Sequence, residues 1–393
     1  MGLVEGFDAL TVGELRARGT LKWSKYGEDV LGAFVAEMDF GTAEPVLQAL
    51  REAVEGAAFG YPPPGASAEL AEACRGWQEK AYGWSVPAER IHTVPDVLRA
   101  FEIATTHFSR PGSPVILPTP CYMPFLTVPG RLGRDILQVP MVQGEQGWSL
   151  DPDALAGAFQ SGGDLLVLCN PHNPLGRVFT PHELAAVAEV VDRYGGRVFA
   201  DEVHAPLTYP GHGHVPYASI GPTAAGHSVT ATSASKAWNI PGLKCAQLII
   251  TNDADAEVVE GMEPFTLNGA GVLGMAANTA AYRHGAPWLA EVLEYLDGNR
   301  RALGDLLAEH LPEAGYRPPE GTYLAWIDLR GAVPRDDPAG RIRERGGVAV
   351  VDGAACGEAG RGWVRLNFAT PRPVLERLVL GISRSARGGT FTP

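Results

Sequence analysis

The chain has 393 residues and a formal net charge of −13; 45% of the residues are apolar and 20% are charged. These values are typical of a globular chain with a large core and about two domains, and the acidic balance argues against nucleic-acid binding, which needs clustered basic residues. No segment approaches the roughly 18 apolar residues of a membrane-spanning helix, and no apolar leader follows a basic N-terminal region, so we expect no membrane partner.

Short apolar segments in the first 285 residues predict the strands of a buried sheet. In chain order they lie at 114–117, 165–169, 197–200, 228–232 and 246–251. Each is apolar on both faces, which is typical of a parallel sheet covered by helices on both sides. Helices are predicted at 151–159 and 180–194, and the second begins with a capping box in which Pro181 follows Thr180.

The pattern changes near residue 285. Apolar residues then recur at helical spacing and predict a long helix over 287–310, which would bridge two domains. Strands follow at 323–328, 348–351 and 362–368, with a closing helix after Pro371. The sequence therefore predicts an α/β chain, with a large parallel-sheet domain followed by a smaller α+β domain.

The five cysteines are scattered, and none belongs to a Cys-x-x-Cys pair. They are predicted to be small core residues in a reducing compartment, without a disulfide or zinc framework. We therefore expect a cytoplasmic protein.

Three polar clusters each follow a predicted strand of the large domain, at the end of the sheet where open α/β folds bind ligands. The clusters are NPHNPLG at 170–176, DEVH at 201–204 and SASKAWNIPGLK at 233–244. The first is also compatible with a plain turn, because Asn, Pro and Gly dominate turns for local reasons. Each cluster is weak alone, but their order and spacing together indicate one site.

The second cluster ends a buried strand, so its two carboxylates must be paired or hydrogen-bonded. Asp201 could hold a proton on a heteroaromatic nitrogen. Metal binding is the competing interpretation, because His204, His212 and His214 follow closely. The spacing of these histidines lacks a helical register, and we expect a solvated loop around His212 and His214 and no metal site.

The third cluster holds two of only five lysines in the chain, Lys236 and Lys244. Arg supplies the positive charge nearly everywhere else, and Arg cannot lose its proton or condense with an aldehyde, whereas a desolvated Lys can do both. Ser233 and Ser235 are short hydroxyls suited to phosphate oxygens, and Lys244 adds a compact charge to the same anion. Two surface lysines in a loop is the competing interpretation.

Taken together, these motifs resemble the fold-type-I pyridoxal-phosphate enzymes of the class I/II aminotransferase superfamily, and in particular the MalY/PatB branch of cystathionine β-lyase-like C–S lyases. Further matches are AEMDF at 36–40, FGYP at 59–62, PTPCYMPF at 118–125 and VRLNFATP at 364–371. The resemblance implies a mostly parallel seven-stranded sheet in a large domain over 46–285. It also implies a small domain over 286–393 that the N-terminal segment 1–45 joins.

The resemblance also implies roles for individual residues toward pyridoxal 5′-phosphate. Lys236 would bond covalently to the cofactor and later act as general base, for which a lowered pKa is expected. Asp201 would keep the ring nitrogen protonated, Asn173 would bind the phenolic oxygen, and Tyr122 would stack on the ring. His204 would order groups beside the cofactor.

The implied phosphate site comprises Ser233, Ser235, Lys244 and the backbone amides of Val97 and Leu98 at a helix start. Tyr61 would reach the phosphate and substrate of a neighbouring subunit, which implies a homodimer.

On the substrate side, the resemblance implies that Arg365 clamps the α-carboxylate and that Asn173 also binds the substrate. Two positions depart from the family pattern. Asp96 would repel phosphate unless it points away, for instance to cap its own helix. Pro206 replaces a common acidic residue and leaves the local loop geometry open.

The function implied is β-elimination from an S-substituted cysteine, such as cystathionine or a natural-product conjugate, giving thiol, pyruvate and ammonia. An aminotransferase, or an oxidative or decarboxylative deaminase of a cysteine conjugate, needs the same residues and remains the alternative. A regulator that retains the fold is disfavoured, because only about 35 residues precede the AEMDF motif, which are too few for an added DNA-binding domain.

Overall fold

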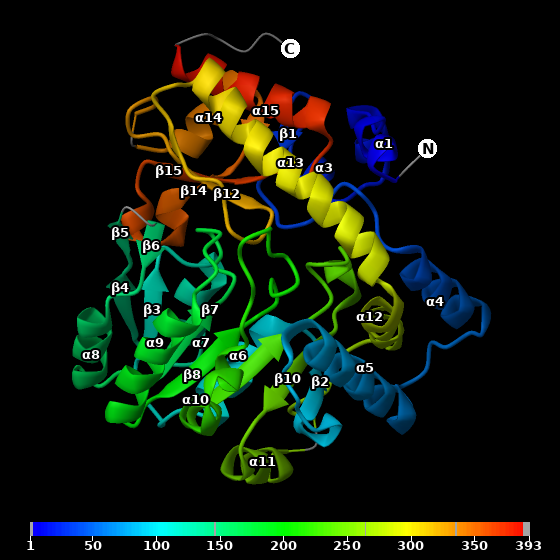
Figure 1. Ribbon diagram of the computed structural model, residues 1–393. Coiled ribbons are helices and arrows are strands. Elements are labelled where there is room, and N and C mark those ends of the chain that lie inside the picture. The colour runs from blue at the N-terminus through cyan, green and yellow to red at the C-terminus, as the bar shows by residue number, and fades with distance from the viewer. Residues whose placement is uncertain (1–2, 145–146, 264, 335, 388–393) are drawn as a thin grey trace.

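A computed structural model describes residues 3–144, 147–263, 265–334 and 336–387. Two layers of different size are stacked in it, as Figure 1 shows, with the long helix α13 lying over the upper one. The last six residues, 388–393, lie outside the described part of the chain.

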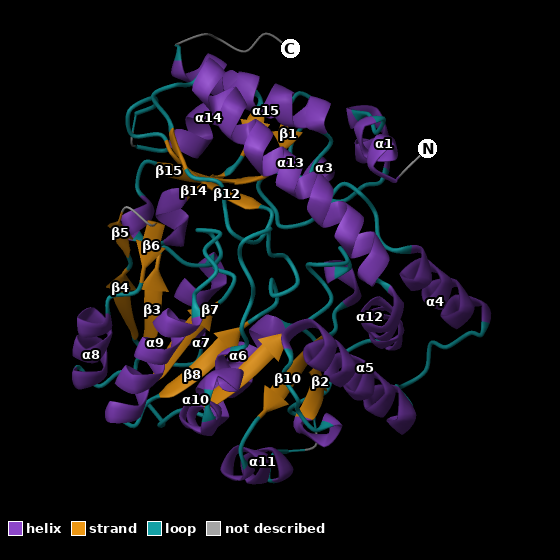
Figure 2. Cartoon of the chain, viewed as in Figure 1, coloured by secondary structure: helices purple, strands orange, loops and turns teal. Residues whose placement is uncertain are grey.

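The larger layer is a seven-stranded sheet in the order β2-β10-β9-β8-β7-β3-β4. Its strands are β2 (Ile91–Val94), β3 (Val115–Thr119), β4 (Ile136–Pro140), β7 (Leu165–Cys169), β8 (Arg197–Asp201), β9 (Ser228–Thr232) and β10 (Ala246–Ile250). The inner strands are buried on both faces because helices cover the sheet on both sides, as Figure 2 shows. The α/β fold expected from the sequence is confirmed.

One strand departs from the parallel arrangement that its sequence pattern suggests. The strand β10 runs antiparallel to both of its neighbours, β9 and β2. It is nevertheless buried along its whole length. An apolar pattern indicates that both faces of a strand are covered, but it does not indicate the direction of the strand. The sequence therefore could not show that β10 is antiparallel to its neighbours.

The smaller layer contains an antiparallel sheet in the order β11-β12-β15-β14. Its strands are β11 (Gly315–Tyr316), β12 (Leu324–Asp328), β15 (Trp363–Asn367) and β14 (Val351–Asp352). The single strand predicted over 348–351 is wrong in detail, because the segment changes partners at Val350. Its first half, β13 (Val348–Ala349), pairs in parallel with β1 (Leu31–Gly32), whereas β14 pairs with β15. A short hairpin of β5 (Val142–Gly144) and β6 (Gly147–Ser149) extends from the large layer.

The helices begin and end close to the positions that the capping signals predict. Asp151 caps α8 and Thr180 forms the expected capping box of α9. The fifteen described helices are α1 (Leu3–Asp8), α2 (Val12–Ala17), α3 (Leu21–Ser24), α4 (Glu44–Glu55), α5 (Pro64–Tyr82), α6 (Val97–His107), α7 (Val128–Arg131), α8 (Pro152–Gln160), α9 (Pro181–Arg193), α10 (Pro222–His227), α11 (Asp253–Glu260), α12 (Val272–His284), α13 (Ala286–His310), α14 (Pro338–Gly346) and α15 (Arg372–Ala386). None of them is long and apolar enough to cross a membrane.

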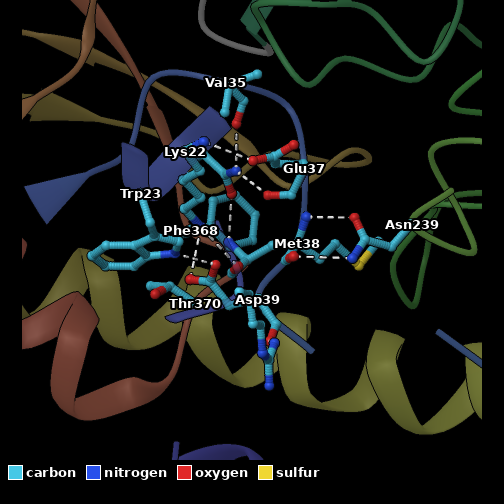
Figure 3. Close-up of polar contacts among 12 residues, drawn as sticks. Lys22, Trp23, Val35, Glu37, Met38, Asp39, Asn239, Phe368 and Thr370 are labelled. Carbon is cyan, nitrogen blue, oxygen red and sulfur yellow. Dashed lines mark hydrogen bonds and ion pairs between the residues drawn. The ribbon is translucent and has the colours of Figure 1, made fainter. Parts of the chain in front are cut away.

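Residues 33–40 form an extended segment, here called the strap, that runs from β1 across the space between the two layers. Figure 3 shows how its far end is fixed: the Lys22 amine and the Trp23 indole both donate to the carboxylate of Asp39, each at 2.8 Å. Lys22 is buried, and its ion pair survives in the interior because further hydrogen bonds satisfy both partners. The Asn239 side chain completes the attachment by bonding both backbone groups of Met38.

Candidate functional site

A cavity of about 480 Å³ lies between the two layers, beyond the carboxyl ends of β7, β8 and β9. This volume is in the range of small-molecule sites. Of the twelve site residues predicted from the sequence, eleven line the cavity: Val97, Leu98, Tyr122, Asn173, Asp201, His204, Ser233, Ser235, Lys236, Lys244 and Arg365. The three polar clusters therefore meet in one place, as the order of the strands requires.

Lys236 lies in the turn that follows β9 and extends its amine into the cavity. The Nζ atom donates a hydrogen bond to the carbonyl oxygen of Ala36 in the strap, at 2.9 Å. Loss of water around the amine, reinforced by the nearby charge of Arg365, lowers its pKa to about 8. The lowered pKa expected from the sequence is confirmed, and near neutral pH an appreciable fraction of this amine is unprotonated.

Asp201 ends β8 and lies at the bottom of the cavity, almost fully buried. One carboxylate oxygen accepts a hydrogen bond from the backbone N–H of Val203 at 3.2 Å, and the thiol of Cys169 donates weakly to the other at 3.7 Å. Burial raises the pKa of this carboxyl to about 6. A cationic partner in the cavity would offset the cost of burying its charge.

Arg365 projects from β15 of the small layer into the same cavity. Its Nη1 donates to the Asn173 side-chain oxygen at 2.9 Å, and its Nη2 donates to the carbonyl oxygen of Phe34 at 2.8 Å. Its Nε is buried and has no hydrogen-bond partner among the described residues. A buried guanidinium without a carboxylate partner in this part of the chain is equipped to bind an anion that enters from outside.

At the large-layer end of the cavity, the first turn of α6 meets Lys244. Asp96 caps this helix, because its Oδ1 accepts from the backbone N–H of Arg99 at 2.8 Å, and its Oδ2 pairs with the Lys244 amine at 2.6 Å. The acidic departure at position 96 is thus explained: the carboxylate faces the helix and Lys244.

The two serines of this corner differ in their hydrogen bonding. Ser233 donates its hydroxyl proton to the Cys245 carbonyl at 2.7 Å and accepts from the backbone N–H of Ser235. The hydroxyl of Ser235, by contrast, has no partner among the described residues. Ser235 is therefore the better placed of the two to donate to an anion.

The aromatic and imidazole side chains complete the walls. Tyr122 is half-buried and packs edge-on against Phe125. His204 is buried, its ring lies edge-on to Tyr323, and its Nδ1 has no partner in the described structure. Burial lowers the pKa of His204 well below its usual value, so this ring is neutral.

The expectation of a solvated loop is wrong for His214. Its side chain is buried, and its Nε2 lies 3.2 Å from a carboxylate oxygen of Glu202. Glu202 also accepts from the backbone N–H of Tyr217 at 2.7 Å, so the carboxylate beside Asp201 is paired as its position demands. Gly and Pro around His214 suggested exposure, but a sequence cannot show that a distant carboxylate closes over a loop. Within the described residues no group of three His, Cys, Asp or Glu is arranged to hold a metal ion.

Tyr61 is the one predicted site residue that the cavity lacks. Its side chain is 99% exposed, beside Phe59 at 66%, on the loop between α4 and α5. Both residues line a shallow surface pocket with Leu243 and Val272.

The contribution of the strap was not predicted from the sequence. The carbonyl oxygens of Phe34 and Ala36 accept from Arg365 and Lys236, and Ala36 also accepts from the Tyr323 hydroxyl at 3.0 Å. The AEMDF motif marked this segment, but backbone carbonyls carry no signature in a sequence. The strap thus holds Lys236 and Arg365 in fixed positions.

The arrangement fits a flat, phosphorylated aldehyde such as pyridoxal 5′-phosphate. An amine with a lowered pKa faces the cavity from Lys236, a buried carboxylate lies at its base, and basic and amide groups gather where α6 begins. Covalent attachment, a counter-charge for a ring nitrogen and an anion site are the three features that such a cofactor requires.

Comparisons with known proteins agree with this geometry. The model of the family described as aminotransferase class I and II matches residues 29–382. Cystathionine beta-lyase of Corynebacterium glutamicum is 38% identical over 92% of this chain and 95% of its own length. Cystathionine beta-lyase PatB of Bacillus subtilis is 32% identical over 93% of this chain and 97% of its own.

A structural relative shows the same likeness. The structure of a Corynebacterium diphtheriae protein, assigned as a PLP-dependent beta-cystathionase, superposes with a TM-score of 0.92 and 40% identity. The match covers 97% of this chain and 99% of that one.

Proposed function

The chain belongs to the aminotransferase class I and II family, and from this premise we propose that it is a pyridoxal-phosphate-dependent carbon–sulfur lyase. Its substrate would be an S-substituted cysteine, cleaved with water to a thiol, pyruvate and ammonia. The observation that carries the proposal is the meeting of Lys236, Asp201 and Arg365 in one cavity. The two relatives named above are cystathionine beta-lyases, and the match to this chain covers nearly their full length. This similarity supports the choice of reaction.

The cofactor would be held by the residues that already face one another. Lys236 would bind its aldehyde, Asp201 its ring nitrogen and Asn173 its phenolic oxygen, with Tyr122 against the ring. Its phosphate would be bound by Ser235, Lys244 and the first amides of α6, with Ser233 shaping the turn. When bound, the cofactor supplies an electron sink that makes the proton at the substrate Cα acidic.

The chain's own residues then direct the proton and the leaving group. Arg365 binds the α-carboxylate and so orients the Cα–H bond toward the Lys236 amine. Once the substrate's amino group has displaced it from the cofactor, the freed Lys236 amine in its neutral form would remove that proton, for which a pKa of about 8 is well matched near neutral pH. The electron pair released at Cα forms a double bond to Cβ as the C–S bond breaks, and the sulfur leaves as a thiolate.

The decisive experiment offers cystathionine to the pure protein loaded with pyridoxal phosphate, without any 2-oxo acid. We expect thiol and pyruvate to appear in equal amounts, because elimination and hydrolysis need only water as a co-reactant. Thiol is measured with a chromogenic disulfide and pyruvate with lactate dehydrogenase. If no thiol forms and amino-group transfer requires a 2-oxo acid, the protein is an aminotransferase and the lyase proposal is wrong.

We also propose a homodimer in which Tyr61 completes the site of the partner subunit. Phe59 and Tyr61 are large, exposed and line one surface pocket, and exposed apolar patches of this kind mark interaction surfaces. Mass measured in solution should give twice the chain mass of 41.7 kDa.

A complementation test checks the shared site. Tyr61→Ala is expected to weaken cofactor binding, and Lys236→Ala to abolish turnover. Mixed dimers of the two variants should recover activity, because one of their sites then combines an intact Lys236 with an intact Tyr61. A monomer, or mixed dimers without recovery, would contradict the shared site.

Residues 46–285 are proposed as the cofactor-binding domain, with 286–393 and the N-terminal 1–45 as the small domain.

We also propose that the protein is located in the cytoplasm. Its five cysteines are free and buried, which is typical of proteins in a reducing compartment.

A further inference from the structure

The mouth of the cavity carries a lysine that no role considered so far uses. Lys25 ends the short helix α3, and both Lys25 and the next residue, Tyr26, line the cavity. The Lys25 amine lies 5.4 Å from the ring centroid of Tyr26 and 4.9 Å from that of Phe34. Two aromatic rings thus hold one positive charge at the entrance.

A second cation approaches the same aromatic group. The Arg343 guanidinium, from α14 of the small layer, also lies 5.4 Å from the centroid of Tyr26. Among the described residues neither Lys25 nor Arg343 forms an ion pair with a carboxylate, although Glu28 and Asp29 are close in the sequence. Two like charges near one ring repel each other, and an anion bound by Lys25 would lessen that repulsion.

The charges of the residues that line the cavity also favour an anionic ligand. Its lining has four basic residues, Lys25, Lys236, Lys244 and Arg365, against two acidic ones, Asp96 and Asp201. This excess of positive charge occurs in a chain whose net charge is −13. After a phosphate and an α-carboxylate have taken their partners, Lys25 remains without one.

Phe34 connects this entrance to the substrate end of the site. Its carbonyl oxygen accepts from Arg365, which would hold the α-carboxylate, while its ring lies beside the Lys25 amine. Met123, Val350 and Val351 supply apolar wall to the same cavity. The cavity therefore offers an S-substituent both hydrocarbon contacts and the cation of Lys25.

We infer that the preferred substrates are cysteine conjugates whose S-substituent is a short hydrocarbon chain ending in a carboxylate, and that Lys25 is the residue that selects them. The inference rests on the proposed lyase function and adds the chemical class of the leaving thiol. The buried ion pair of Lys22 with Asp39 fixes the position of α3. Lys25 directly follows this helix, so its backbone is held in place.

The test compares S-(2-carboxyethyl)-L-cysteine with S-(2-carbamoylethyl)-L-cysteine, which have nearly the same shape and differ in charge. For the loaded wild-type enzyme we expect kcat/KM to favour the carboxylate by about three- to fivefold, mostly through KM, as one ion pair with an exposed lysine provides. Lys25→Met should bring the ratio close to one, and Lys25→Arg should keep it. Lys80→Met, which removes an exposed lysine on α5, is the matched control and should leave the ratio unchanged.

A wild-type ratio near or below one, or a Lys25→Met variant that keeps the full ratio, would overturn the inference while leaving the lyase activity intact. If neither compound nor cystathionine releases thiol, the proposed function has failed. In that case the dissociation constants of the two conjugates are measured by calorimetry on wild type and Lys25→Met. The inference holds if wild type binds the carboxylate conjugate more tightly than the carbamoyl conjugate and Lys25→Met binds the two equally.

Discussion

Replacing Lys236 with Ala is expected to reduce thiol release by at least about two to four powers of ten, the range that a positioned general base contributes. The variant also lacks the primary amine that would bond covalently to the cofactor aldehyde, so it should lose the absorbance of covalently held cofactor. Stopped assays for thiol and a visible spectrum of the loaded protein measure the two effects separately.

Lys236→Arg is the matched control for this prediction. It restores a positive charge and similar bulk, but a guanidinium neither loses its proton nor condenses with an aldehyde. We therefore expect Lys236→Arg to be as inactive as Lys236→Ala, with a thermal midpoint close to that of wild type. Wild-type turnover by either variant would show that another residue carries the chemistry.

Changing Asp201 to Asn is expected to lower turnover by about three powers of ten. A charge about 4 Å from a developing partner charge, at an intermediate dielectric constant, contributes about 4 kcal/mol, and each 1.36 kcal/mol is a factor of ten in rate. The isosteric amide retains the packing at the end of β8 while removing the negative charge. Steady-state kinetics with saturating cofactor measure the loss.

The pH dependence of cofactor binding tests whether the negative charge of Asp201 is what stabilises the bound cofactor. Because burial raises the pKa of Asp201 to about 6, this carboxyl becomes neutral as the pH falls through about 6. A bound cation favours the ionised form, so cofactor affinity in wild type should fall as the pH decreases below about 6. The cofactor's own titration affects both proteins equally, so this loss should be missing from the Asn variant. Identical pH profiles would exclude the proposed role.

Strands and helices with strong local signals could be predicted from the sequence almost to the residue. The strand at 165–169 and the helix capped by Thr180 are examples, because burial on two faces and a reciprocal capping box both leave marks in a short segment. The strands β2 and β4 were not predicted. Both lie at the edges of the sheet, where burial is partial and the apolar pattern weak.

The site was predictable where it is built from side chains and unpredictable where it is built from backbone or long-range contacts. Lys236, Asp201 and Arg365 have distinct chemistry, so their residue types and motifs reveal them. The carbonyl of Ala36 and the closure of His214 over Glu202 depend on how distant segments meet. A local sequence pattern does not encode contacts of this kind.

The strap has a consequence for how the protein matures in the cell. It begins within the first tenth of the chain, yet its partners include Arg365, Asn367 and Ala369 near residue 370. A nascent chain on the ribosome that has not yet reached these residues has no closed cavity, however well its central sheet has folded. We therefore expect this pocket to hold the coenzyme only after residues 365–369 have been synthesised and have folded against the strap.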